Sequence, residues 1–493
     1  MSFLIPVCFY RIYYLQLTGT LKKLKLDRLL SLLSSVERKE FQQLLRTTLL
    51  GASAREQKFC TAWMALPESR RGQKDREKVF KKIYPGEAYD DLKLRRHQSS
   101  LTGKLERYLA FKEIDANEYH QRELLLSAYE RRDDYDLFLK TKKDLLRQLD
   151  KVQPRTSAYF DRKLQVLYRY FDHPRTNRED PNDPTVDQLM ETLDQSFALH
   201  KLRFAMMQRS REMAYRSDPQ PIRFLGTLVE ELEGPWARKE PIIQIYRLAS
   251  RFQSGADEVD FKQYETELFA HFEFLSHRDR MDLFLVGLNF LVREARTDIR
   301  WYKDALRWYK FGLNQNLFVG NGHFITLTFI NIVIAAATVD DHDWGRTFVD
   351  TYREQLASED YDRVYHYAMG VLSFFERDYT TAIDQLSVVE YQGLLDLPAR
   401  SYLARAYFKL YRSDRTYHQV VISYLVSYEQ YLLRNKTWPV NKIWPNLNLC
   451  RLLQRTVRRL ESWDDENRVK IWYLQEVAQT ESLLNRTWLL NNF

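Results

Sequence analysis

Apolar residues recur at helical spacing along almost the whole chain, and no convincing stretch alternates apolar and polar positions as a β-strand does. Residues 26–112 show the pattern of several short helices followed by one long helix. Two short helices should meet at Ser34-Ser35, where Ser35 is a candidate N-cap of the second. Asp90 or Asp91 is a candidate N-cap of the long helix, which ends near Lys112. The pattern predicts an all-α fold that begins with a small helical unit.

Further helices are expected after this unit, interrupted by one irregular stretch. Residues 113–172 are helical in pattern, whereas residues 173–184 combine three prolines with Asn, Arg and Asp, as a linker loop does. Two helices should then continue to about Ser217. The remaining helices of the region 185–300 are expected near 241–253, 258–276 and 278–295.

Small residues recur at a fixed period in the region 301–434. Ala335, Gly370 and Ala404 lie 35 and 34 residues apart, each in the middle of an apolar helix. A small residue at such a position lets a partner helix approach closely, and helix length plus turn length sets the period. We therefore expect stacked helix pairs here, closed by capping helices over residues 435–493.

The residues around these positions resemble the tetratricopeptide consensus. Met369-Gly370, Tyr379 and Ala382 fit one repeat, and Leu403-Ala404 with Tyr407 fit the next, although His366 stands where the consensus has Trp. This resemblance implies a right-handed α-solenoid of stacked antiparallel helix pairs. The chain from about Leu26 also resembles a family of large, uncharacterised, all-helical bacterial proteins, through segments such as EKVFKKIYPGEAYDDLKL and LPARSYLARAYFKL. That second resemblance implies a fold but no activity.

The tetratricopeptide resemblance also implies a concave groove. Counted from the small residue of each repeat, the groove-facing positions predicted to bind a partner are Tyr367, Val371, Phe374, Phe375, Arg405, Phe408 and Lys409. An amphipathic helix or an extended apolar segment would be anchored on Tyr367 and Phe374 and oriented by an acidic group near Arg405 and Lys409. The alternative is that adjacent helices cover these side chains, as happens to most large apolar residues. The leading hypothesis is a scaffold or adaptor.

Charge suggests a second hypothesis. The chain carries 75 Lys and Arg against 67 Asp and Glu, but residues 1–112 alone hold 23 against 11. Two helices joined by a short turn with Lys81, Lys82, Arg95 and Arg96 are also typical of a nucleic-acid-binding regulator. The alternative is a solvated basic face on a small helical unit.

Motifs of catalysis and of cofactor or metal binding are missing from the sequence. It contains no phosphate-binding loop, nucleophile elbow, HExxH or paired metal ligands, so we expect no enzyme and no cofactor. His342 within Asp340–Asp343 comes nearest to a metal cluster, but it falls where the repeat needs a turn. Cys8, Cys60 and Cys450 are widely spaced, which predicts neither disulfides nor a zinc site and suits a reducing cytoplasm.

Two stretches could be mistaken for membrane segments. Met1–Leu17 is apolar but lacks the basic start and the cleavage site of a signal peptide, so residues 1–25 are expected to form a docked or frayed terminal segment. A shallow membrane-surface anchor is the alternative. Phe324–Val339 has no charge, but it is shorter than the roughly 20 residues of a membrane span, and we expect a buried solenoid helix.

Overall fold

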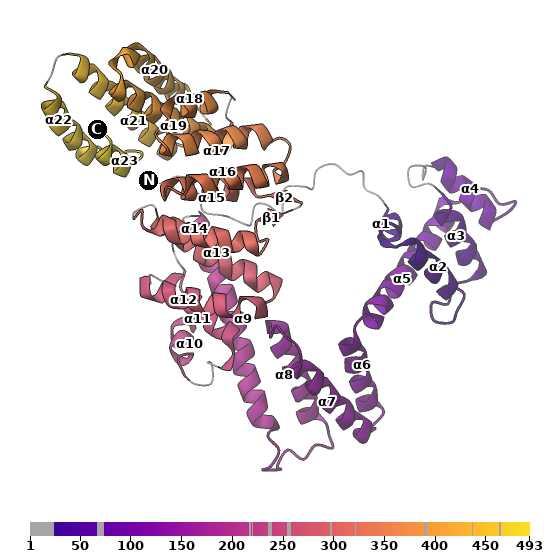
Figure 1. Ribbon diagram of the computed structural model, residues 1–493. Helices are drawn as coiled ribbons and strands as arrows, with labels where there is room; N and C mark the ends of the chain where they lie inside the picture. The colour runs from indigo at the N-terminus through magenta and orange to yellow at the C-terminus, as the bar shows by residue number, and fades with distance from the viewer. Residues whose placement is uncertain are drawn as a thin grey trace. The chain divides into compact units, whose positions relative to one another are not determined.

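The computed structural model confirms an all-α fold. It describes residues 24–66, 73–215, 218, 220–234, 239–253, 258–295, 298–320, 322–388, 392–435, 437–462 and 465–493, which form 23 α-helices and one pair of two-residue strands (Figure 1). The expectations for residues 1–23 lie outside these described residues. The chain divides into two compact units between Phe197 and Ala198, here called the N-terminal and C-terminal units.

The N-terminal unit begins with a small apolar core of its own. Its helices are α1 (Lys25–Leu32), α2 (Ser35–Leu44), α3 (Ala54–Met64), α4 (Gln73–Ile83), α5 (Asp91–Asp115), α6 (Glu118–Arg131), α7 (Tyr135–Asp150), α8 (Ser157–Asp172) and the first part of α9 (Thr185–Tyr215). Buried residues from Leu26 to Tyr108 form one core shared by α1–α5. Helices α1–α5 therefore share one packed apolar cluster.

Side chains at the helix starts explain where these helices begin. The N-cap of α2 is Ser34 and not Ser35, because Ser34 and Glu37 form a reciprocal capping box. Asp90 caps α5 as predicted, since its carboxylate accepts hydrogen bonds from the backbone N–H groups of Leu92 and Lys93 at 2.8 and 3.1 Å. The sequence located these starts to within one residue.

Glu56 ties α3 to α5 and makes this core sensitive to acid. Its carboxylate accepts hydrogen bonds from the Ser100 hydroxyl and from the Ser53 backbone N–H (2.7 Å), and it pairs with Lys104 Nζ at 3.1 Å. Burial alone would raise the pKa of Glu56, but the hydrogen bonds from Ser100, Ser53 and Lys104 outweigh it and lower the pKa to about 2.

Because the folded state holds Glu56 ionised, its contribution to stability is present above the ordinary pKa of 4.5 and is lost as pH falls toward 2. We expect Glu56→Gln to lower the free energy of unfolding by roughly 2 kcal/mol at pH 7, with the difference from the parent vanishing near pH 2. Urea unfolding at several pH values measures this. Glu106→Gln, at a carboxylate that is 47% exposed, is the control and should change little; a pH-independent loss in Glu56→Gln would contradict the prediction.

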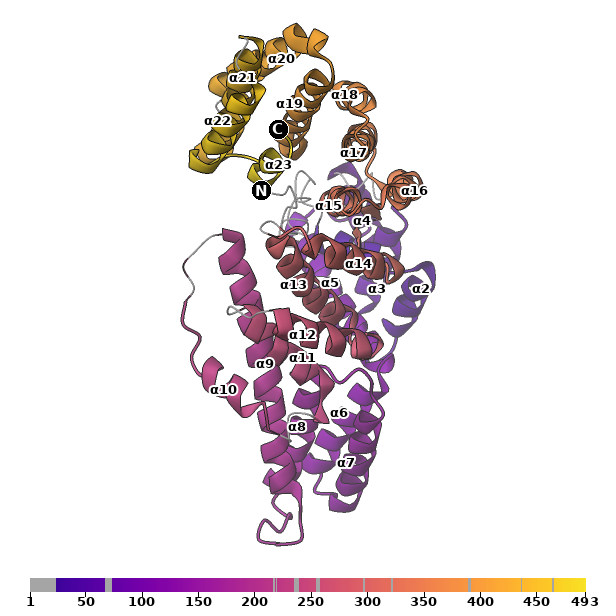
Figure 2. The same cartoon turned by 60° about the vertical axis from the view of Figure 1, so that its left-hand side comes forward.

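Helix α9 is longer than the sequence analysis expected. It runs without a break through 31 residues, whereas we predicted two helices in this stretch (Figure 2). The physical reason is that neither glycine nor proline occurs between Pro184 and Pro219, so nothing ends the helix early. Residues 173–184 form an irregular loop as predicted, but the two compact units divide later, within α9.

The C-terminal unit contains the rest of α9 and all later elements. These are α10 (Leu225–Glu231), α11 (Pro241–Gln253), α12 (Glu258–His271), α13 (His277–Glu294), α14 (Trp301–Asn314), β1 (Val319–Gly320), β2 (His323–Phe324), α15 (Thr326–Thr338), α16 (His342–Tyr352), α17 (Tyr361–Phe375), α18 (Tyr379–Ser387), α19 (Asp396–Ser413), α20 (His418–Arg434), α21 (Val440–Glu461), α22 (Glu466–Gln479) and α23 (Arg486–Asn491). The antiparallel β1–β2 pair was not foreseen.

Helices of the region 301–434 contact their neighbours along the chain. Helix α15 contacts both α16 and α17, α17 contacts α18 and α19, and α19 contacts α20 and α21. Gly370 lies where α17 meets α18, because a Cβ atom there would be 2.5 Å from Leu386 Cγ. Ala404 is completely buried, as is most of α15. Gly370 therefore marks a helix contact, and Ala404 is a core residue.

Candidate interaction surfaces

The predicted groove residues lie on α17 and α19, but most of them are core residues. Tyr367, Val371, Phe374, Arg405 and Phe408 are between 0% and 4% exposed. Of the seven predicted positions, only Phe375 and Lys409 keep partial access to solvent. An open groove anchored on Tyr367 and Phe374 is therefore not present in this structure.

The chain's own C-terminal segment covers part of this surface. Trp488 of α23 lies against Phe374, with ring centroids 6.1 Å apart, and Asn485 Nδ2 donates a hydrogen bond to Ser401 Oγ at 3.2 Å. The Arg405 guanidinium stacks on the rings of Tyr402, Phe374 and Trp488 at 4.2, 4.9 and 5.4 Å. Arg405 thus binds aromatic rings inside the protein, and it does not orient an acidic ligand.

The four predicted nucleic-acid contacts are exposed, but acidic residues lie among them. Lys81 and Lys82 are in the last turn of α4, and Arg95 and Arg96 are near the start of α5. Arg95 Nε pairs with the Asp91 carboxylate at 2.6 Å. Arg76 Nη2 lies 3.0 Å from Asp91, and Lys93 Nζ lies 2.6 Å from Glu87. Part of the positive charge of this face is therefore neutralised within the unit.

A polar hollow of about 530 Å³ lies between α7, α8 and the start of α9 in the N-terminal unit. The Lys142 ammonium lies 3.0 Å from the centroid of the Tyr170 ring, and the Tyr170 hydroxyl donates to Asp183 Oδ2 at 2.8 Å. Asp183 Oδ1 also accepts from the Thr185 backbone N–H at 2.9 Å. Burial lowers the pKa of Lys142 to about 8. Because both charge signs line it, the hollow favours no single class of ligand.

The histidine and cysteine residues form no metal site in the described part of the chain. No group of three or more His, Cys, Asp or Glu side chains is placed to hold an ion there. His342 begins α16, and its Nε2 lies 3.5 Å from Asp340 in the preceding turn. Cys60 and Cys450 are buried free thiols. Among the same residues, no helix is both long enough and apolar enough to cross a membrane.

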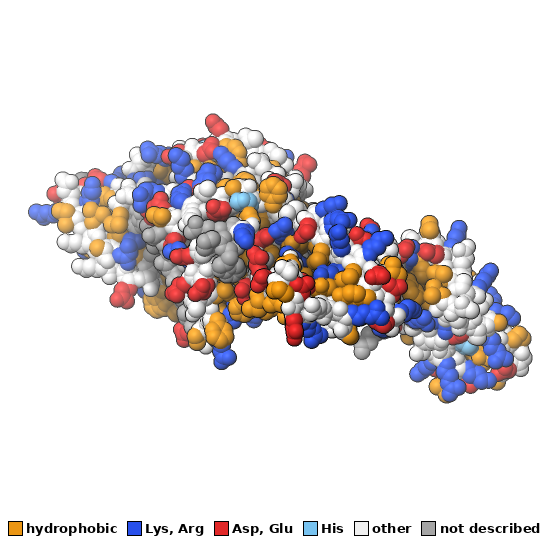
Figure 3. Space-filling model, turned by 90° about the horizontal axis from the view of Figure 1, so that it is seen from below, with side chains coloured by type: hydrophobic (Ala, Val, Ile, Leu, Met, Phe, Trp, Pro, Cys, Tyr) orange, Lys and Arg blue, Asp and Glu red, His pale blue; other side chains and the backbone are white. Residues whose placement is uncertain are grey.

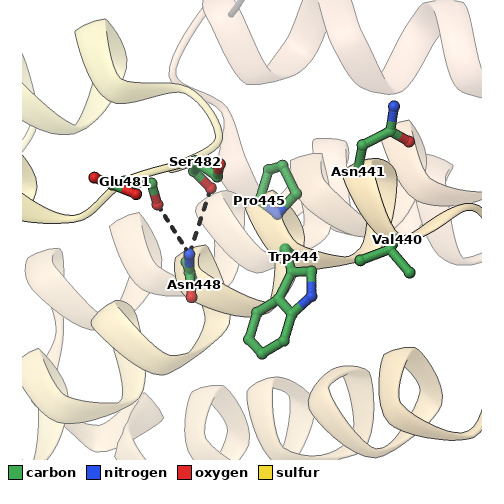
Figure 4. Close-up of a pocket in the computed structure, with 7 residues that line it drawn as sticks. All are labelled: Val440, Asn441, Trp444, Pro445, Asn448, Glu481 and Ser482. Carbon is green, nitrogen blue, oxygen red and sulfur yellow. Dashed lines mark hydrogen bonds between the residues drawn. The ribbon is translucent and has the colours of Figure 1, made fainter.

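A second hollow, of about 450 Å³, surrounds an exposed tryptophan on α21 (Figure 4). Its lining residues are Val440, Asn441, Trp444, Pro445, Asn448, Glu481 and Ser482. Asn448 Nδ2 donates to the carbonyl oxygens of Glu481 and Ser482 at 3.1 and 3.5 Å, which joins α21 to the chain after α22. Trp444 is 48% exposed and could contact a small apolar group. The hollow offers one aromatic ring, which is a small area for a protein partner.

A row of exposed apolar side chains follows one face of α9. Here the α9 stripe means the side chains of Val186, Met190, Leu193, Phe197 and Phe204, which are 39–59% exposed. Their spacings of four, three, four and seven residues place them on one side of a helix. His200 falls on the same side, and its ring stacks on Phe204 with centroids 6.2 Å apart.

Sequence analysis missed the α9 stripe for two reasons. Two helices were expected in this stretch, so no single register along it was considered. The helix also carries a second apolar face, buried through residues such as Leu199 and Leu202, so its apolar positions did not separate into one stripe. Apolar side chains reach the surface in patches among charged residues (Figure 3). Only burial, which comes from tertiary packing, separates the exposed face of α9 from its core face.

Comparison with known proteins does not assign this surface. No protein-family model, no curated protein and no solved structure matches the chain. The tetratricopeptide resemblance and the resemblance to bacterial helical proteins therefore stay predictions, and any function must be argued from the surfaces described above.

Proposed function

We propose that this protein is a non-enzymatic scaffold or adaptor, a right-handed solenoid of antiparallel helix pairs that binds an amphipathic helix of a protein partner. The α9 stripe, and not the predicted groove, is the proposed binding surface. The observation that carries this proposal is the regular exposure of five large apolar side chains along one helix. Contiguous exposed apolar surface of this kind is uncommon on a monomeric soluble protein and is typical of interaction sites.

The partner class follows from the geometry of the stripe. An exposed apolar face along a helix is complementary to the apolar face of another helix, whose residues at positions i, i+3, i+4 and i+7 pack between its side chains. Phe197 and Leu193 lie at the centre of the stripe and are the expected hot spots, because central apolar anchors dominate interface energetics.

The test replaces the centre of the stripe in the full chain. We expect Leu193→Glu with Phe197→Glu to reduce the recovery of binding proteins more than tenfold, because each buried anchor contributes about 2 kcal/mol or more. Quantitative mass spectrometry after affinity capture measures the loss relative to the parent. Melting should change little, since both side chains are exposed.

The matched control is Phe274→Glu with Val420→Glu, two apolar residues that are 60% and 46% exposed outside α9. This control should recover the same proteins as the parent. If the α9 variant and the control retain the same set of proteins, the α9 stripe is not the binding surface.

A further inference from the structure

We infer that the partner of the α9 stripe is a second copy of the same helix, packed antiparallel, so that two chains form a twofold-symmetric dimer. This inference rests on the proposed function, because it names the occupant of the same surface. It is carried by two features of α9 taken together: the spacing of its exposed apolar side chains and the arrangement of charge beside them.

The spacing is that of a coiled-coil seam. With the half-buried His200 included, the seam positions follow one another at intervals of four, three, four, three and four residues from Val186 to Phe204. Alternating intervals of three and four define the heptad positions that face a partner helix in a two-stranded coil. Eighteen residues of helix span about 27 Å, or nearly three heptads. Because α9 is one continuous helix, this register follows from the helix alone.

The charges beside the seam are self-complementary. Asp187 and Asp194 each come one residue after a seam position in the first half of α9. Lys201 has the same place after a seam position in the second half. Neither Asp194 nor Lys201 forms an ion pair with another described residue, and neither is engaged by any other described group. An acidic first half and a basic second half on one side of a helix attract a second copy only when that copy runs in the opposite direction.

One antiparallel register combines the four seam positions from Leu193 to Phe204 with the charges beside them. It places Phe197 against His200 of the second copy and Leu193 against Phe204 of the second copy, which fills consecutive layers of the seam. In this register Met190 and Val186 lie opposite Met207 and Arg211 of the second copy. The same register brings Asp194 next to Lys201 of the second copy, and the twofold axis repeats this pair. In a parallel pair the corresponding neighbours of Asp194 and Lys201 are Leu189 and Ser196, which leaves both charges without partners. The charge pattern therefore selects the antiparallel arrangement.

The experiment measures self-association of the full chain by sedimentation equilibrium over a range of concentrations. We expect a dimer with a Kd on the order of micromolar, as a short interface implies. Phe197→Glu should abolish it, and Phe274→Glu, at an exposed phenylalanine outside α9, should leave it unchanged. Circular dichroism of each variant verifies that the helices are retained.

Charge exchange tests the register. Asp194→Lys and Lys201→Asp should each raise the dimer Kd about tenfold, because two attractive pairs become repulsive, and the double variant should restore it to within about threefold. A dimer that survives Phe197→Glu, or a double variant that does not recover, would overturn the antiparallel α9 pairing.

A monomer at all concentrations would also overturn the inference. If the monomer still loses another captured protein through Leu193→Glu with Phe197→Glu, the proposed function stands and only the identity of the partner was wrong. If the monomeric protein loses no captured protein through these substitutions, the proposed function and the dimer inference are both wrong.

Discussion

Gly287→Leu is expected to lower the free energy of unfolding by about 3 kcal/mol, at the upper end of what overpacking a core costs. A Cβ atom at Gly287 on α13 would lie 2.2 Å from the outer carbons of the Trp308 ring. Trp308 cannot move aside, since it is completely buried and packs against Phe261, Phe269 and Phe284. Its indole N–H also donates to Glu265. Any side chain at position 287 therefore displaces a fixed aromatic cluster.

Gly370→Leu extends the same prediction to the repeat region. The added side chain would enter space held by Leu386, so we expect a loss of about 1–3 kcal/mol. Gly226→Leu, where no atom lies within 4 Å of the new Cβ, is the control in the same compact unit. Urea unfolding compares all three. If Gly287→Leu and Gly370→Leu unfold like Gly226→Leu, the helix contacts at α13–α14 and α17–α18 are wrongly placed.

Features that depend on nearby residues could be predicted from the sequence. The start of α5 at Asp90, the loop at residues 173–184 and the buried character of α15 follow from capping chemistry, proline content and a run of apolar residues. The 34-residue spacing located Gly370 at a helix contact and Ala404 in the core for the same reason, because local helix and turn lengths set the period.

Features that depend on tertiary packing could not be predicted in this way. Whether Phe374 faces solvent depends on where α23 lies, and α23 is more than one hundred residues away along the chain. The exposed face of α9 and its buried face are both apolar, so periodicity alone does not say which of them packs against the protein. Sequence indicated which residues are large and apolar, but only the packed structure shows which of them remain available to a partner.

Phe374 is the residue at which the two interpretations of the predicted groove differ most. If Phe374 belongs to the core, Phe374→Ala should lower the free energy of unfolding by about 3–5 kcal/mol, the usual cost of removing a buried phenylalanine ring. The structure supports this outcome, because Phe374 is 4% exposed and its ring contacts Tyr402, Tyr379 and Trp488 with centroids 5.2–6.1 Å apart. Arg405 covers it further at 4.9 Å.

Phe274→Ala provides the matched control, because that ring is 60% exposed in the same unit and its removal should change stability by no more than about 0.5 kcal/mol. Trp488→Ala should produce part of the Phe374→Ala effect, since it removes one of the contacts that cover the ring while leaving the ring itself in place. Urea unfolding of the three variants decides between the interpretations. Should Phe374→Ala and Trp488→Ala both unfold like Phe274→Ala, α23 does not cover α17 and α19, and the groove is open to a partner after all. A large loss for Phe374→Ala with a smaller loss for Trp488→Ala would instead show that the chain fills its own predicted groove, which leaves α9 as the surface on which partners must be sought.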